Sequence, residues 1–81
     1  MYERKYKIEN GKLVKKSTGV PIPEDEPLFV LRAKDKNALP TLMGYLALCN
    51  DLRHREEVFK SIQDFKDFAT DNPETMKEPT I

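Results

Sequence analysis

The opening of the chain shows alternating side-chain types that end at a turn signal. In residues 2–9, Tyr2, Arg4, Tyr6 and Ile8 alternate with Glu3, Lys5, Lys7 and Glu9, which is typical of a β-strand. Asn10-Gly11 follows, the dipeptide that best adopts the positive φ angles of a type I′ turn. Residues 12–17 are the expected return strand, and Thr18-Gly19 should end it. Leu13 and Val14 are its only apolar residues, which favours an edge position with one wet face. We therefore expect a β-hairpin over residues 1–19.

Residues 20–36 predict a connector followed by a buried strand. Two prolines exclude a helix and limit ladder hydrogen bonds, so residues 20–23 should be extended. Residues 24–27 form an acidic turn. Residues 28–32 (LFVLR) are short, apolar and partly β-branched, which favours a central strand covered on both faces. We expect this third strand to complete a small antiparallel sheet.

A first helix is predicted from residue 37 onward. Asn37 is the expected N-cap, because it puts Pro40 at the third helical position, where the missing amide hydrogen has no helical partner to lose. Asp35 is the alternative cap. The helix should end near Cys49 or Asn50.

A second helix is predicted over residues 52–70, with Asp51 as its cap and Asn72-Pro73 as its end. Apolar residues three and four positions apart predict one buried stripe along it. The stripe comprises Val58, Phe59, Ile62, Phe65 and Ala69, with Phe68 at its margin.

Together these elements predict a single α+β domain, in which an N-terminal β-hairpin plus a third strand form a small antiparallel sheet packed by a C-terminal helical hairpin. The expected parts are the hairpin (1–19), the connector and core strand (20–36), the two helices (37–72) and a tail (73–81). The tail shows no periodic pattern, so we expect it to be loosely ordered unless Met76 or Ile81 docks.

Residues 38–49 contain no charged side chain, although 35% of all residues are charged. A helix over this segment carries apolar side chains on two faces instead of one. The rest of the chain is too short to cover both faces, so we expect a second copy of the protein, or a partner, to do so. The expected interface residues are Leu39, Leu42, Met43, Tyr45, Leu46 and Leu48.

Length and cysteine content point to a protein of marginal stability when alone. An 81-residue domain buries only about 60–65% of the surface of its unfolded chain. Cys49 is the only cysteine, so no internal disulfide is available, and its apolar neighbours favour a packing role. No secretion signal is evident, and the apolar segment is shorter than the roughly 20 residues that span a bilayer. We therefore expect a soluble, cytoplasmic homo-oligomer without membrane contact.

The 14 basic and 14 acidic residues give a formal net charge of zero, which argues against a protein that coats long nucleic acid. The distribution is uneven: residues 1–19 contain six basic and two acidic side chains, and residues 50–81 contain eight acidic and five basic ones. Such asymmetry can orient subunits or steer an anionic ligand, although a mixed solvated surface is its commoner explanation.

Enzyme signatures are missing from the sequence. It has no glycine-rich phosphate loop, no metal-ligand cluster and no recognisable Ser-His-Asp motif. His54 and Cys49 could supply a base and a nucleophile, but the helix break expected between them argues against a dyad. Residues 24–26 could hold a divalent cation, but carboxylates in an exposed turn usually face water. We predict no catalytic residue, metal site or cofactor, and a protein that is not an enzyme.

Two groups of basic residues are the expected ligand-binding residues. Arg32, Lys34 and Lys36 lead into the positive end of the first helix, a place that attracts anions. Arg53 and Arg55 begin the second helix, where basic residues oppose the helix dipole unless something negative lies nearby. A two-fold pairing through the apolar helix would bring the first group of one copy near the second group of its partner and build an anion pocket.

Purely structural explanations stand beside these expectations. Arg53 and Arg55 could instead form ion pairs with residues 56–57 or with the acidic turn of a neighbouring copy. Tyr6 is a further ligand-binding candidate, because an aromatic ring beside basic residues can stack on a nucleotide base. Cross-strand packing explains Tyr6 and Tyr2 equally well.

Several motifs resemble those of small accessory proteins of bacteriophages and prophages. The segments PIPEDEPLFVLRAKDKNAL and DNPETMKEP are similar to the PEDEPLF, LRAKD and ERMKEP-like motifs of those proteins. The likeness covers most of the chain from Gly11 to Pro79. No activity accompanies these motifs, so they assign no functional residue. The resemblance implies a viral accessory protein that acts on host defences in the cytoplasm of the host cell.

These observations favour a non-enzymatic homo-oligomer that binds and sequesters a small anionic ligand, such as a nucleotide immune signal. The alternative is an inhibitor or adaptor that docks on a host protein through its apolar helix face. Sequestration predicts a stable homo-oligomer that responds to a nucleotide. The adaptor predicts a monomer or weak dimer that is indifferent to nucleotides.

Overall fold

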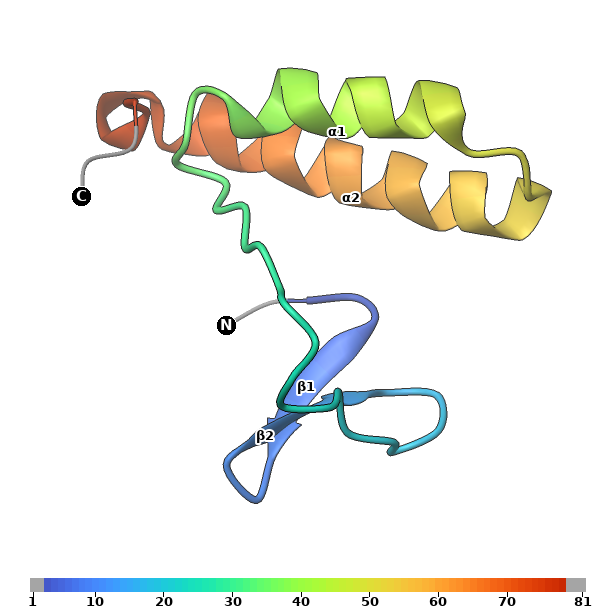
Figure 1. Cartoon of the computed structure of the whole chain (residues 1–81). Helices are drawn as coiled ribbons and strands as arrows, with labels where there is room; N and C mark the ends of the chain where they lie inside the picture. The colour runs from blue at the N-terminus through green and yellow to red at the C-terminus, as the bar shows by residue number, and fades with distance from the viewer. Residues whose placement is uncertain (1–2, 79–81) are drawn as a thin grey trace.

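The computed structural model describes residues 3–78 of the chain and confirms the predicted α+β class (Figure 1). In chain order the elements are β1 (Tyr6–Glu9), β2 (Lys12–Lys15), α1 (Ala38–Leu48), α2 (Leu52–Asp71) and the 3-10 helix η1 (Pro73–Thr75). The two α-helices lie side by side and antiparallel, and the hairpin lies to one side of them, joined by an extended segment that runs to the start of α1 (Figure 1). No helix in the described part is both long and apolar enough to cross a lipid bilayer.

β1 and β2 form the predicted antiparallel hairpin, with Tyr6 opposite Lys15. Asn10 and Gly11 connect the strands with φ angles of 53° and 74°, as a type I′ turn requires. Both strands are shorter than predicted, because β1 begins at Tyr6 and β2 ends at Lys15. Tyr2, near the expected start of the first strand, lies outside the described residues.

The outer edge of β2 is covered by the connector, residues 20–22. The Ile22 N–H donates to the Leu13 carbonyl at 2.9 Å. Val14 forms a single antiparallel bridge with Pro21 and is buried. The connector therefore occupies the position that a third strand would need on this side of the hairpin.

The prediction of a third strand is wrong. Residues 28–32 pair with no strand in the described part of the chain, and Phe29 and Val30 are 86% and 76% exposed. The connector covers the edge of β2, and the chain then leaves the hairpin to reach α1 (Figure 1). An apolar, β-branched run fits a strand, but it does not reveal whether its own chain leaves a sheet edge free to receive it.

α1 begins at the predicted position, with Asn37 as its first flanking residue and Pro40 as its third helical residue. The side chain of Asn37 makes no capping hydrogen bond. Instead, a carboxylate oxygen of Asp35 accepts the Asn37 N–H at 2.7 Å, and the Thr41 hydroxyl donates to the Asn37 carbonyl at 2.7 Å. Both candidate caps thus contribute to the helix start, through different groups.

α2 is capped as predicted, because the Asp51 carboxylate accepts a hydrogen bond from the His54 N–H at 2.9 Å. The core lies between α1 and α2, and the packing role predicted for Cys49 is confirmed. Its buried side chains are Cys49, Val58 and Ile62, against which the partly buried Leu39, Leu42 and Leu46 pack.

The buried stripe of α2 is narrower than predicted. Val58 and Ile62 are buried, and Phe65 and Ala69 are partly buried. Phe59 is 60% exposed, so its assignment to the stripe is wrong. Because successive helical residues are about 100° apart, a single packed neighbour covers Val58 and leaves Phe59 to the side.

The helical pair does not pack on the sheet as predicted. The core cluster contains residues of α1, α2 and their connection, and it contains no described residue of the hairpin. The hairpin reaches α2 through Arg4 and Lys5, which bond to side chains of that helix. Ile8 of β1 is 65% exposed, so it does not join a common core with the helices.

The C-terminal segment docks on the chain just before α1. The Lys77 N–H donates to the Lys34 carbonyl at 3.0 Å, and the Lys36 N–H donates to the Lys77 carbonyl at 2.9 Å. Met76 is partly buried, so the condition set for an ordered tail is met up to residue 78. Ile81 lies outside the described residues.

Candidate anion-binding site

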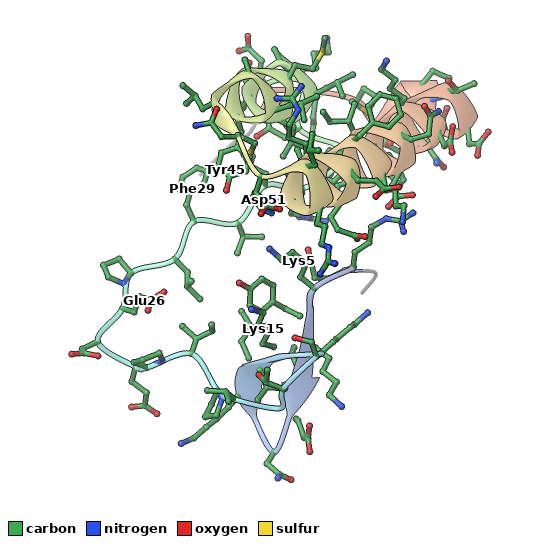
Figure 2. All side chains as sticks on the ribbon, turned by 90° about the vertical axis from the view of Figure 1, so that its right-hand side faces the viewer. Lys5, Lys15, Glu26, Phe29, Tyr45 and Asp51 are labelled. Atoms are coloured by element: carbon green, nitrogen blue, oxygen red, sulfur yellow. The ribbon has the colours of Figure 1, made fainter. Side chains whose placement is uncertain are left out.

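Basic side chains from just before β1 and from the end of β2, at the open end of the hairpin, line a hollow of about 340 Å³ between the hairpin and α2. We call it the basic hollow. Figure 2 shows Lys5 between the hairpin and the helical pair, with Lys15 further along the hairpin. The lining residues are Arg4, Lys5, Lys15, Lys16, Ser17 and Glu57.

Arg4 anchors the hairpin to α2 through a bidentate ion pair. Its Nε and a terminal nitrogen donate to the two carboxylate oxygens of Asp64 at 2.6 and 2.9 Å. The hydrogen bonds and charge of Arg4 hold the pKa of Asp64 below its ordinary value of 3.8, against an opposing effect of burial. Much of the charge of Arg4 is therefore compensated by Asp64.

Lys5 lies at one end of a short polar chain that crosses to α1. Its Nζ is 3.5 Å from Nδ1 of His54, and Nε2 of His54 is 2.9 Å from the hydroxyl of Tyr45. The Tyr45 and His54 rings meet edge to face. A lysine ammonium can only donate, so Nδ1 of His54 accepts, and a neutral His54 carries its proton on Nε2. The ammonium of Lys5 keeps further N–H groups for another acceptor.

Lys15 and Lys16 supply positive charge that no carboxylate in the described part of the chain neutralises. Both are exposed, and within residues 3–78 no carboxylate forms an ion pair with either. Nζ of Lys16 donates to the backbone carbonyl of Glu3. The hollow's one acid, Glu57, is paired with Lys60 at 3.3 Å. The basic hollow thus favours a small anion, because lysine ammonium groups bind phosphate as point charges.

Tyr6 lies beside this charge. It is directly opposite Lys15 in the antiparallel ladder, and directly opposed residues share one face of a sheet. Tyr6 is partly buried. Its position fits both explanations offered for it, cross-strand packing and an aromatic surface next to a bound anion.

Arg32 and Lys34 line a second, smaller hollow of about 240 Å³, which we call the mixed hollow. Its lining residues are Phe29, Val30, Arg32, Lys34, Asp35, Lys77 and Glu78. Two acidic side chains offset part of the positive charge there. Lys36 is exposed next to it and does not line it.

Arg53 and Arg55 lie at the far end of the helical pair from the mixed hollow, because the chain enters α1 at one end and turns into α2 at the other (Figure 1). Arg55 donates from one guanidinium nitrogen to the carbonyls of Leu46 and Cys49, at 2.8 Å each. Arg53 is exposed. No acidic residue in the described part of the chain pairs with Arg53 or Arg55.

Of the six residues expected to form the self-association surface, three are packed inside their own chain and three are exposed. Leu39, Leu42 and Leu46 pack against the core of their own chain. Met43, Tyr45 and Leu48 remain exposed. Leu52 continues this exposed apolar surface into α2, with 82% of its area exposed.

Cys49 and His54 do not form a dyad. The Cys49 thiol donates to the Tyr45 carbonyl at 3.3 Å, and the ring nitrogens of His54 face Tyr45 and Lys5. Cys49 is buried in the helical core. The thiol therefore has the environment of a packing residue.

Sequence reasoning missed Lys5, Lys15 and Lys16 as site residues. The excess of positive charge in residues 1–19 was a usable signal. The Asn10-Gly11 turn fixes which residues of the two strands face each other, and Lys15 and Lys16 are thereby brought back to the start of the chain. The hollow forms because α2 lies beside these charged strand ends, and the sequence does not reveal that placement.

Comparison of the chain with protein-family models, with curated proteins and with solved structures finds no match in any of the three.

Proposed function

We propose that this protein is a self-assembling, non-enzymatic binding protein that captures a small anionic ligand of nucleotide type in the basic hollow. The observation that carries the proposal is the convergence of Lys5, Lys15 and Lys16 on one hollow, where none of them forms an ion pair with a carboxylate of residues 3–78. A bound phosphate group would supply the missing negative charge.

The size and surroundings of the basic hollow support a nucleotide-sized ligand. Its volume of about 340 Å³ falls within the roughly 300–1,000 Å³ of small-molecule sites. Tyr6, opposite Lys15, offers an aromatic surface for a base. Arg32, Lys34 and Arg53 remain candidates for a second, composite site between copies, whereas Arg55 is engaged with backbone carbonyls of its own chain.

Self-assembly is supported by the small core and by the apolar surface of the helical pair. The residues that the structure describes include only five buried hydrophobic side chains. Met43, Tyr45, Leu48 and Leu52 form an exposed surface that a second copy would cover. These observations, together with the resemblance to phage accessory proteins, support the function that we infer: the protein forms a homo-oligomer that sequesters a nucleotide signal of the host defence.

The test is thermal unfolding with inorganic triphosphate and with a panel of nucleoside phosphates and cyclic nucleotides. A ligand at 100 times its Kd stabilises the folded state by about 2.7 kcal/mol, which raises the Tm of a domain this small by roughly 10 °C or more. Replacing Lys15 and Lys16 by alanine should abolish the shift. The matched control replaces Lys7 and Lys12, which lie on the same hairpin outside the hollow, and should keep it. A shift that survives K15A/K16A, or no shift with any probe, contradicts the proposed site.

A second candidate function is supported by the apolar turn between the helices. Leu48 and Leu52 are 79% and 82% exposed on either side of that turn, a pattern that fits docking on a host protein. An adaptor of this kind would sediment as a monomer or weak dimer and show no thermal shift with nucleotides. A stable oligomer with a nucleotide response excludes it as the main function.

A further inference from the structure

Residues 28–31 form an unpaired extended segment with apolar side chains. Leu28, Phe29 and Val30 are 56%, 86% and 76% exposed. Within residues 3–78, no hydrogen bond joins the backbone of this segment to any other residue. Figure 2 shows Phe29 on the chain that leads from the hairpin to the helical pair. An exposed run of this composition, with its backbone groups unpaired, is a template for strand pairing.

Charges of opposite sign flank the segment. Glu24, Asp25 and Glu26 precede it, and Arg32, Lys34 and Lys36 follow it. The three acidic side chains are exposed, and none forms an ion pair with another described residue. The segment therefore has an acidic end, an apolar centre and a basic end.

Antiparallel pairing with an identical segment is the arrangement that this charge order favours. Turning one copy around brings its acidic end beside the basic end of the other copy, at both ends of the ribbon. With Phe29 opposite Phe29, Glu26 faces Arg32 and Glu24 faces Lys34; with Val30 opposite Val30, Glu26 faces Lys34 and Glu24 faces Lys36. Parallel pairing would place like charges side by side, which is unfavourable.

We propose that residues 28–31 pair antiparallel with the same residues of a second copy of this chain, about a two-fold axis near Phe29 and Val30. Such an interface is isologous, so each copy gives and receives the same contacts. The pairing satisfies backbone groups of Leu28 to Leu31 and covers their apolar side chains. It rests on the self-assembly part of the proposed function and adds a second contact surface to the apolar surface of the helical pair, independently of the basic hollow.

The mixed hollow takes part in this arrangement. It is lined by Phe29, Val30, Arg32 and Lys34, which are all in or next to the paired segment. Arg32 and Lys34 then bind carboxylates of the second copy's acidic turn. Because these ion pairs are solvent-exposed, the dimer should weaken as the salt concentration rises.

The test is a charge exchange measured by sedimentation. Glu24→Lys with Glu26→Lys gives a chain with two basic ends, and Arg32→Glu with Lys36→Glu gives a chain with two acidic ends. All four positions are exposed, so the fold should tolerate these changes, and circular dichroism checks this. Each variant alone should dimerise at least about tenfold more weakly than the wild type, because like charges now meet at both ends. A one-to-one mixture should restore the dimer as a heterodimer.

The control exchanges Lys12 and Lys66 for glutamate, which makes the same change in net charge away from the segment, and it should remain as dimeric as the wild type. A monomeric wild type overturns the inference, and so do variants that dimerise normally or a mixture that forms no heterodimer. Nucleotide binding is measured separately by thermal unfolding. An oligomer that is unaffected by the exchange, but that K15A/K16A deprives of its nucleotide response, refutes this interface and leaves the proposed function standing.

Discussion

Arg55 was expected to bind a ligand, but in the structure its side chain bonds to the backbone of its own chain. A basic residue in the first turn of α2 is unfavourable for the dipole of that helix. In the structure, its guanidinium reaches back to the preceding helix and donates to the carbonyls of Leu46 and Cys49. These carbonyls lie at the negative end of α1, where a cation is favourable. Arg55 is thus unfavourable for the dipole of α2, but it caps the C-terminal end of α1.

Arg55→Ala should lower the free energy of unfolding by about 1–3 kcal/mol, because two carbonyls lose a charged donor. Arg53→Ala is the matched control. Arg53 is exposed and two residues away, so its loss should change stability by less than about 0.5 kcal/mol. Urea denaturation followed by circular dichroism measures both. Equal losses in the two variants would contradict the capping role.

At the scale of elements, glycine has opposite effects in the hairpin and in α1. Gly11 has a φ of 74° in the hairpin turn, a conformation that side chains rarely adopt. Gly44 lies in the middle of α1, and a Cβ added there would meet no atom within 4 Å. The turn therefore requires Gly11, whereas Gly44 lowers the stability of α1 without meeting a steric need.

Gly44→Ala should stabilise the protein by about 1 kcal/mol, because alanine has a smaller entropic cost in a helix. Gly11→Ala should destabilise it by about 1–2 kcal/mol, because alanine is strained at positive φ. The two variants carry the same chemical change, so thermal unfolding of the pair isolates the backbone effect. A loss of stability in Gly44→Ala would show that another chain approaches this face of α1.

At the scale of the whole molecule, the hairpin is attached to the helices by polar contacts. The core lies between the helices, and Arg4 and Lys5 make the side-chain hydrogen bonds between the hairpin region and α2 in the described part of the chain. The position of the basic hollow depends on this attachment, since both the hairpin and α2 line it. The ion pair of Arg4 with Asp64 therefore links stability to the geometry of the proposed site.

Asp64→Asn should lower the free energy of unfolding by about 1 kcal/mol at neutral pH, which is the upper end of the range for a partly exposed ion pair. The pKa of Asp64 lies below 3.8 in the folded state, so as the pH falls the unfolded chain binds the proton first. The ion pair therefore contributes fully at a pH well above 3.8, and its contribution is lost as the pH falls through the folded pKa.

The difference between wild type and Asp64→Asn should accordingly decrease in acid, as urea titrations between about pH 3 and pH 7 would show. Asp67→Asn on the same helix is the control for the loss of one negative charge. A wild-type advantage that does not change over this range would contradict the role of the ion pair.

The sequence by itself determined the elements whose signals are local. Asn10-Gly11 located the hairpin turn, Asp51 located the start of α2, and the apolar surroundings of Cys49 predicted its burial. Each depends on residues within a few positions of one another, such as a cap and its helical N–H groups, so their energetics can be read along the chain.

The tertiary structure alone decided which surfaces meet. Residues 28–31 have the composition of a core strand, yet the connector occupies the edge of β2 and leaves them unpaired. Lys5, Lys15 and Lys16 form a hollow only because the hairpin turns back beside α2, and Arg55 becomes a cap only because α1 ends next to it. Whether a side chain is a core residue, a ligand contact or a cap depends on what the fold places opposite it, and residues far apart in the chain supply that environment.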